Sequence, residues 1–347
     1  MIEIDGSIGE AGGQVLRTSL SLSLLTQKPL TVFNIRAGRK SPGLKPQHLK
    51  SVSAAREISG GTVTGGKIGS RLITLIPGAI QPGEYFFDIG SAGSTSLLLQ
   101  TIYLPLSLAN GNSRVIICGG THVEWSPCYH YLVWHWLPYL LQMGFNFDLS
   151  LEHAGYYPKG GGKISVDIAP INHLKPINII KRGKVNQIRG ISAVSNLPRK
   201  IAERQRNQVI RRLGSRYPLN DIRIKDLPSY NKGTVLLLLV ECEHSRACFF
   251  ALGAPGKPAE RVADEAIDST IEYLDSEGAI DPFLADQLML PLAIMDLPSR
   301  LTTTKITNHL QTNAIIIRHF IPVDITIEGL IGCPGRIEIV PLGKDKQ

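Results

Sequence analysis

The sequence predicts a mixed α/β (α+β) fold in which three repeated α/β units form the main body and a small α/β domain is inserted. Two observations lead to this fold class. A Gly/Ser-rich turn, an apolar helical stretch and a β-branched strand recur in that order along the chain. One internal segment also differs from the rest in composition, and 347 residues are enough for a large core with an insertion.

The three copies of the unit share a pattern of elements rather than a set of identical residues. Glycines precede the helical stretch in the first copy (Gly12 and Gly13) and in the second copy (residues 90–93). The pattern over residues 308–320 fits either a helix or a strand. The expected helix and strand of each copy are 14–25 and 30–35, then 94–108 and 114–118, then 286–293 and 314–317.

The segment 181–277 is richer in Arg, Lys and Glu than its surroundings. Its change of character predicts a small α/β domain inserted into a main domain made of residues 1–180 and 278–347. A stretch with prolines near residues 170–176 and a turn at Gly278 mark its borders. Within it we expect a polar amphipathic helix at 202–213, an apolar strand at 234–241 and a second helix at 259–274.

The overall composition, 43% hydrophobic and 19% charged, is that of an ordinary globular protein. Five cysteines without CxxC spacing and a charged N-terminal segment predict a reducing, cytoplasmic location. No apolar run reaches the ~20 residues that span a bilayer. A net charge of +8, with basic clusters at residues 36–50 and 199–216, favours a polyanionic partner such as a nucleic acid or a nucleotide.

His309 follows a polar loop and directly precedes the apolar run 314–317. An imidazole at the edge of a hydrophobic element, surrounded by hydroxyl and amide groups, can be held in one tautomer and one orientation. A nucleophilic or general-base histidine needs this environment. The same pattern is typical of a histidine that caps a helix or strand, so its position alone leaves both interpretations open.

The glycine-rich segment 6–17 leads into the first expected helix and exposes backbone N–H groups at the positive end of its dipole, which suits an anion. It matches neither the P-loop nor the dinucleotide-binding pattern. Glu10 is a candidate ligand for Mg²⁺, and Arg17 lies one helical turn further along, within reach of a phosphate. The alternative is a tight turn with an exposed ion pair.

A second basic loop covers residues 36–44 and is followed by Gln47 and His48. Arg36 and Arg39 can each contact phosphate oxygens through two N–H groups, and the small residues between them let a ligand approach. The alternative is an ordinary solvated surface. Residues 90–94 and 156–162 are turn signals first, and Asp286 and Gln287 are compatible with ordinary positions at the start of a helix.

Zinc-site and serine-hydrolase patterns find no support in the sequence. The nine histidines show no HExxH motif, and there is no GxSxG motif. His122, His130 and His135 lie among aromatic residues, which favours packing in the core over metal binding. The aromatic neighbours are Trp125, Tyr129, Tyr131, Trp134 and Trp136.

Taken together and in order, the motifs resemble those of the RNA 3′-terminal phosphate cyclase family. Each motif alone has little specificity, whereas seven in the same order cover nearly the whole chain. They are residues 9–17 (GEAGGQVLR), 36–44 (RAGRKSPGL) with Gln47 and His48, 89–94 (IGSAGS) with Gln100, 119–121 (GGT), 157–162 (YPKGGG), 285–287 (ADQ) and 309–313 (HLQTN).

The resemblance implies a fold related to that of enolpyruvyl transferases and an ATP-dependent conversion of an RNA 3′-phosphate to a 2′,3′-cyclic phosphate. It implies ATP, Mg²⁺ or Mn²⁺ and an RNA with a 3′-terminal phosphate as the molecules bound. His309 would attack the α-phosphorus of ATP and form a covalent histidine–AMP. The RNA phosphate would take up this AMP, and the neighbouring 2′-OH would then release it by cyclisation.

The resemblance also assigns roles to individual residues. His309 would be the catalytic nucleophile, and Glu10 would hold the metal ion. Two features depart from the family pattern: Phe283 stands where tyrosine is common, and the stretch 122–125 is more apolar than expected. The remaining assignments are Arg17, Arg36, Arg39 and Gln47 for the RNA phosphate, and Gln100, Phe250, Phe283, Asp286 and Gln287 for the nucleotide.

Two other functions fit the same fold. A ribosome-assembly homologue without catalytic activity would lack the histidine, and His309 is present here. A carboxyvinyl transferase is suggested by fold analogy alone and would not need a histidine that accepts AMP. The sequence does not distinguish a monomer from a homodimer.

Overall fold

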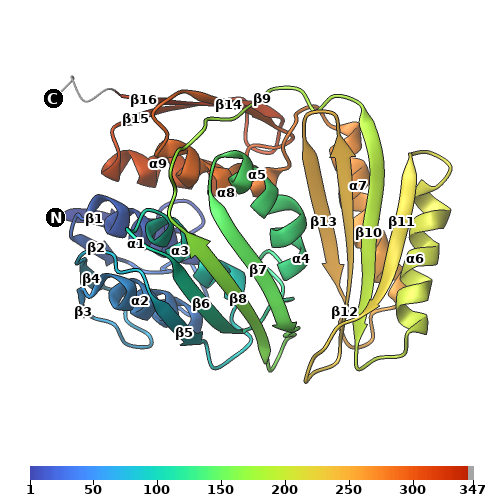
Figure 1. Ribbon diagram of the computed structural model, residues 1–347, viewed down its shortest axis with the longest axis horizontal. Coiled ribbons are helices and arrows are strands. Elements are labelled where there is room, and N and C mark those ends of the chain that lie inside the picture. The colour runs from blue at the N-terminus through green and yellow to red at the C-terminus, as the bar shows by residue number, and fades with distance from the viewer. Residues whose placement is uncertain (343–347) are drawn as a thin grey trace.

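Three copies of one βαβαββ unit make up the main body of the computed structural model, which describes residues 1–342 (Figure 1). Each copy has a four-stranded sheet in which the first strand pairs in parallel with the second. The second then pairs antiparallel with the fourth, and the fourth with the third. The sheet orders are β1-β2-β4-β3, β5-β6-β8-β7 and β9-β14-β16-β15.

The bounds of the elements show the repeat directly. The first copy contains β1 (Ile2–Asp5), α1 (Gly13–Thr26), β2 (Leu30–Phe33), α2 (Pro46–Ser59), β3 (Thr62–Thr64) and β4 (Ile73–Ile76). The second contains β5 (Glu84–Asp88), α3 (Thr95–Ser107), β6 (Ser113–Gly119), α4 (Tyr129–Tyr131), the π-helical turn η1 (Leu132–Trp136), α5 (Leu137–Gln142), β7 (Asn146–His153) and β8 (Gly162–Ala169). The third contains β9 (Asn178–Ile179), α8 (Pro282–Ala293), β14 (Ser299–Thr303), α9 (Asn308–Phe320), β15 (Val323–Glu328) and β16 (Gly335–Pro341).

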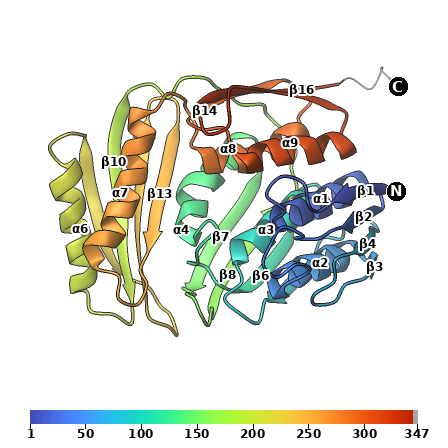
Figure 2. The ribbon, with the colours of Figure 1, turned by 180° about the vertical axis from the view of Figure 1, so that it is seen from behind.

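A fourth sheet interrupts the third copy between its first strand, β9, and its first helix, α8. Its strand order is β11-β10-β12-β13, and α6 and α7 pack against it and against each other (Figure 2). The predicted fold class, three α/β units with an inserted α/β domain, is confirmed, while the borders at residues 181 and 277 stay predictions. The inserted elements are β10 (Val185–Ser195), α6 (Lys200–Leu213), β11 (Leu219–Asp226), β12 (Gly233–Cys242), β13 (Arg246–Leu252) and α7 (Ala259–Asp275).

Strand β12 explains how the inserted sheet is held. Because side chains alternate between the two faces of a strand, Leu236 and Leu238 join the core under α6 and α7, while Leu237 and Leu239 join the core of the main body. Both faces are therefore buried, which accounts for an apolar run without polar alternation.

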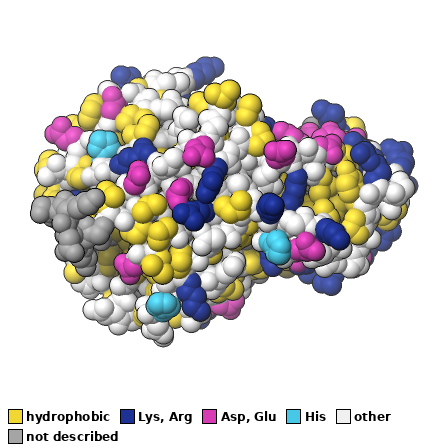
Figure 3. Space-filling view, turned by 90° about the horizontal axis from the view of Figure 1, so that it is seen from above, with side chains coloured by type: hydrophobic (Ala, Val, Ile, Leu, Met, Phe, Trp, Pro, Cys, Tyr) yellow, Lys and Arg dark blue, Asp and Glu magenta, His cyan; other side chains and the backbone are white. Residues whose placement is uncertain are grey.

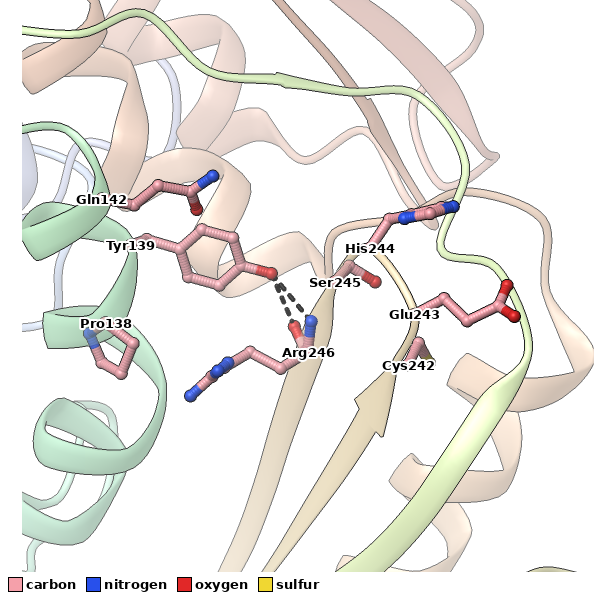
Figure 4. A pocket seen from close by; sticks show the side chains of 8 residues that line it. All are labelled: Pro138, Tyr139, Gln142, Cys242, Glu243, His244, Ser245 and Arg246. Carbon is pink, nitrogen blue, oxygen red and sulfur yellow. Dashed lines mark hydrogen bonds between the residues drawn. The ribbon is translucent and has the colours of Figure 1, made fainter.

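A small hollow of about 180 Å³ marks the edge of the contact between α5 and the β12–β13 turn (Figure 4). The Tyr139 hydroxyl fixes this edge, because it donates to the Arg246 carbonyl at 3.1 Å and accepts from the Arg246 N–H at 2.9 Å. In Figure 3 the inserted domain forms the smaller of two lobes, and basic and acidic side chains are interspersed over the face shown. Among residues 1–342, no helix is long and apolar enough to cross a bilayer.

Residues 314–317, expected as a strand, lie inside helix α9. The run AIII favours a strand by composition, but the preceding residues supply a helix start. The Thr307 side chain accepts a hydrogen bond from the Leu310 N–H at 3.0 Å, which is a helix N-cap. Leu310, Ala314 and Ile317 then follow at helical spacing and are all buried.

Of the aromatic cluster beside the histidines, Tyr131 and Trp136 are buried and Tyr129 and Trp134 are half-buried, whereas Trp125 is 95% exposed and was wrongly expected in the core. Trp125 lies in a loop before α4, with a backbone φ of 62°, and not in the packed helix. His135 and Asp281 form a buried pair with Nε2 and Oδ2 2.5 Å apart. Asp281 also accepts from the Phe283 and Leu284 N–H groups, so the pair ties η1 to the start of α8.

Replacing Thr307 by Ala should lower the free energy of unfolding by about 1 kcal/mol, because the Leu310 N–H loses its cap. Urea denaturation monitored by circular dichroism measures this difference. Thr307→Ser keeps the hydroxyl and should match the wild type. Equal stability of all three proteins would contradict a helix that starts at this residue.

Candidate functional site

The candidate site forms where the N-terminal ends of α1, α8 and α9 meet. One side-chain amide joins all three helices: Gln14 Nε2 donates to Asp286 Oδ1 at 3.0 Å and to the His309 carbonyl at 2.9 Å. Gln14 belongs to the first copy of the unit, and Asp286 and His309 belong to the third. The site therefore exists only when these two copies pack together.

A second set of contacts reinforces this junction. Asn313 Nδ2 donates to Asp286 Oδ1 as well as to the Asp286 carbonyl, at 3.2 Å from the latter. Thr18 Oγ1 donates to Asn313 Oδ1 at 2.8 Å. Gly9 lies against α9 so closely that a Cβ there would come within 2.1 Å of Thr312 Oγ1. Two of the predicted motifs, GEAGGQ and HLQTN, thus fit directly against each other.

The His309 ring lies between two carboxylates. Its Nε2 is 3.2 Å from Glu10 Oε2, and its Nδ1 is 4.0 Å from Asp286 Oδ2. The side chain is 45% exposed, so a substrate atom can reach the ring. Arg39 stands on the far side of Glu10, with its Nη2 3.7 Å from Glu10 Oε2.

Asp286 has the most strongly shifted pKa among the acidic residues of the site. Burial raises the pKa of Asp286 to about 6, and the nearby charges of His309 and Arg17 partly oppose this rise. Burial lowers the pKa of Arg17 to about 10, against the opposing charge of Asp286. Both groups are therefore ionised above neutral pH, and they are half-buried groups of opposite charge that stabilise each other.

His48 lies at the start of α2 and is electrically neutral. Burial, followed by the charges of Arg17, Arg36 and Lys45, lowers the pKa of His48 to about 3. Its Nδ1 accepts from the Lys45 N–H at 3.2 Å, and a Cβ on Gly13 would come within 2.3 Å of its Nε2. Gly13 thus lets a neutral imidazole approach the first turn of α1.

The predicted phosphate-binding residues do not all meet. Arg17 and Arg39 lie beside Asp286 and Glu10, as given above. Arg36 Nη1 donates to the carbonyls of Ser41 and Gly43, at 2.7 and 2.9 Å, so this guanidinium supports its own loop.

Gln47 connects the first copy of the unit to the second. Its Oε1 accepts from the Ser94 N–H at 3.4 Å, at the start of α3. The contacts of Arg36 and Gln47 are thus structural in this state, and the predicted roles of both residues at an RNA phosphate stay predictions.

The predicted nucleotide-binding residues form a second group on the other side of α8. Gln100 Nε2 donates to Gln287 Oε1 at 3.0 Å, and Gln287 Nε2 donates to the Tyr131 hydroxyl at 3.4 Å. The Tyr131 ring is in contact with Phe250, with ring centroids 6.2 Å apart. Phe283 is 61% exposed at the start of α8. Asp286, by contrast, belongs with His309.

Comparison with known proteins agrees with the family that the motifs resemble. The family model described as RNA 3′-terminal phosphate cyclase matches residues 8–327. The chain belongs to the RNA 3′-terminal phosphate cyclase family. Relatives that carry this name come from Koribacter versatilis (41% identical, covering 96% of this chain and 93% of the relative) and Nostoc punctiforme (42%, 92% and 94%). A third, from Methanopyrus kandleri, is 39% identical and covers 99% of both chains.

A solved structure of the enolpyruvyl transferase NikO from Streptomyces tendae is also similar, with a TM-score of 0.41 and 10% identity. The match covers 98% of this chain and 48% of that one. This likeness is distant and supports no statement about activity. Membership of the cyclase family rests on the sequence relatives and the family model.

Three residues of the candidate site make contacts that the sequence did not predict: Gln14, Asn313 and Tyr131. Gln14 and Asn313 belong to the motifs GEAGGQ and HLQTN, so their membership of these motifs could have identified them. Tyr131 gave no such signal, because it belongs to an apolar helical segment whose pattern indicates packing in the core. His48 follows Gln47 after the basic loop, and the sequence predicted no function for it.

The Asp286→Asn variant should show how the pKa of this carboxyl makes the stability of the protein depend on pH. Since the folded protein raises the Asp286 pKa to about 6, it holds this proton more tightly than the unfolded chain, where the value is near ~3.9. The stability of the wild type relative to the variant is therefore greatest below pH ~4 and falls by about 3 kcal/mol as the pH rises past 6. Urea denaturation across this range measures the difference, and a constant difference would contradict the assignment.

Proposed function

We propose that this protein converts an RNA 3′-phosphate to a 2′,3′-cyclic phosphate with ATP, through a covalent histidine–AMP on His309. The observation that carries the proposal is the His309 ring, accessible to a substrate and placed between Glu10 and Asp286. Two cations are near: Arg39 contacts Glu10 at 3.7 Å, and Arg17 is close enough to Asp286 for each charge to shift the pKa of the other. The family name of the relatives gives independent support.

The contacts of His309 favour Nε2 as the attacking atom. Asp286 faces Nδ1, and its other oxygen is occupied by Gln14 and Asn313. Glu10 lies nearer to the ring, 3.2 Å from Nε2, but on this proposal it holds the metal ion. Asp286 is then the free carboxylate beside the ring, which favours a proton on Nδ1 and leaves the lone pair on Nε2. That lone pair points to the Glu10 side, where the ring is open to solvent.

The reaction then runs in three displacements. Nε2 attacks the α-phosphorus of ATP, an N–P bond forms, and the bond to pyrophosphate breaks. An oxygen of the RNA 3′-phosphate attacks the same phosphorus, and the N–P bond breaks to release His309. The 2′-oxygen attacks the 3′-phosphorus, loses its proton and expels AMP, which leaves the cyclic phosphate.

Glu10 fits the hard cation, Mg²⁺ or Mn²⁺, that such a reaction requires. Among residues 1–342, no cluster of three or more acidic, His or Cys side chains is preassembled for a metal. A magnesium ion needs only one or two carboxylates when phosphate oxygens and waters complete its shell. When bound, the ion neutralises charge on the phosphates. Glu10 would hold it on the Nε2 side of His309.

The remaining residues would bind and orient the two substrates. Arg17 and Arg39 would hold the RNA phosphate, with the neutral His48 as a further hydrogen-bonding group and Arg36 and Gln47 shaping the surrounding loops. Gln100, Gln287, Phe250 and Phe283 would bound the adenosine. Since each step moves charge among phosphates, fixed cations and N–H groups contribute most of the stabilisation. We also propose a cytoplasmic location, in keeping with the free state of all five cysteines.

Incubation with α-³²P-labelled ATP and Mg²⁺ tests the mechanism. The wild type should retain acid-labile, alkali-stable label, and His309→Ala should retain none because the nucleophile is gone. Arg39→Ala is the matched variant: it should still take up label but cyclise RNA at least ~10-fold more slowly, because it acts on the RNA phosphate.

Absence of label on the wild type would refute the cyclase mechanism and favour the ribosome-assembly or carboxyvinyl alternatives. Label that persists on His309→Ala would move the nucleophile to another residue. Loss of both activities in Arg39→Ala would refute its assignment to the RNA phosphate.

A further inference from the structure

Three loops form a continuous surface that leads away from the phosphate side of the site. They comprise residues 90–93, 157–161 and 228–232, and we name them the three-loop surface. In Figure 1 the end of β7, the start of β8 and the start of β12 meet at the lower edge of the molecule, where the main body borders the inserted domain. The proposed reaction assigns no role to this surface.

The first loop adjoins the phosphate-binding residues. Gln47 follows the basic loop and precedes His48, and it accepts from the Ser94 N–H. A Cβ on Gly93 would lie 2.9 Å from the Gln47 Cβ, so the two backbones are in close contact. The turn at residues 90–93 is therefore the direct neighbour of the site on this side.

The second and third loops continue the path. A Cβ on Gly160 would lie 2.6 Å from the Ser91 carbonyl oxygen, which packs the second loop onto the first. Asn231 Nδ2 donates to the Gly160 carbonyl at 2.7 Å. Asn196, in the inserted domain, holds the third loop by donating to the Ser229 and Asn231 carbonyls, at 2.7 and 3.1 Å.

Tyr230 ends this path at a groove of about 760 Å³ between the main body and the inserted domain. Its ring is 75% exposed and is stacked on His153, with centroids 4.8 Å apart and planes 26° apart. One face is thus held in place while most of the ring remains open. A rigid, exposed aromatic ring of this kind offers a platform for a planar ligand.

The charges beside Tyr230 are suited to a polyanion. Lys159 and Lys232 are exposed in the second and third loops, and within the described part of the chain neither takes part in an ion pair. Asp226, the carboxylate in the groove, is neutralised by Arg199 at 2.9 Å. Protein interfaces are depleted in lysine, whereas grooves for single-stranded nucleic acid combine aromatic platforms with free cations.

We propose that the three-loop surface binds the nucleotides that precede the RNA 3′-phosphate, with one base stacked on Tyr230 in the groove. This inference rests on the proposed function, because the cyclase site fixes where the RNA ends. The 3′-phosphate would lie at Arg17 and Arg39. The upstream chain would pass over residues 90–93 and 157–161 and reach Tyr230.

Binding of two 3′-phosphorylated RNAs tests the surface: one of about 12 nucleotides, within the usual range of single-strand sites, and a dinucleotide, which lacks the upstream chain that the proposal places on Tyr230. Fluorescence anisotropy should show that Tyr230→Ala binds the longer RNA roughly 5- to 100-fold more weakly, the usual effect of losing one stacked base. Cyclisation of the dinucleotide and self-adenylylation should be unchanged. Tyr230→Phe keeps the ring and should bind as the wild type does.

Phe86→Ala is the matched control, because Phe86 is an exposed aromatic residue on β5, outside the three loops. Wild-type affinity of Tyr230→Ala for the longer RNA would overturn the proposal, as would an equal loss with the dinucleotide or with Phe86→Ala. Anisotropy needs no ATP. A wild type that takes up no label would therefore refute the cyclase mechanism without affecting the RNA-length comparison.

Discussion

The hydrogen bonds of the Gln14 amide are the constraint on which the site depends. This single group joins helix α1 to α8 and α9, across 272 residues to Asp286 and 295 residues to His309. The inserted domain lies between β9 and α8, so the chain leaves the main body and returns before the site can form. Packing of the first copy of the unit against the third therefore determines where the imidazole stands.

The electrostatics of the site follow from that packing. Asp286 is largely buried, with 18% of its side chain exposed, and Gln14 and Asn313 both donate to its Oδ1. These two donors and the nearby positive charge of Arg17 stabilise its ionised form, which faces one nitrogen of His309. His48, neutral beside Arg17, leaves the positive charge free for a phosphate. The glycines Gly9 and Gly13 permit these close approaches because a Cβ at either would clash.

Local patterns in the sequence predicted the elements that begin with strong signals. Helices α1 and α3, predicted at residues 14–25 and 94–108, are both present. In each case the glycine turn before the helix and the apolar periodicity within it indicate the same element. The prediction of a strand at 314–317 was wrong: its isoleucines favour a strand, but the Thr307 cap, seven residues before the run, starts a helix. The prediction that Trp125 packs in the core was wrong because aromatic composition does not reveal which residue lies in a loop with positive φ. Gln14 could not be paired with Asp286, because a contact across 272 residues leaves no local pattern.

The tautomer of His309 tests the central claim most directly, since Asp286, held by Gln14, should fix a proton on Nδ1 and leave Nε2 free when Mg²⁺ engages Glu10. Nitrogen-15 NMR of histidine-labelled protein with saturating Mg²⁺ at neutral pH distinguishes the two tautomers, and His309→Ala identifies the signal. The account predicts a protonated Nδ1 and an unprotonated Nε2. A proton on Nε2 in the neutral ring, with Nδ1 bare beside Asp286, would contradict it.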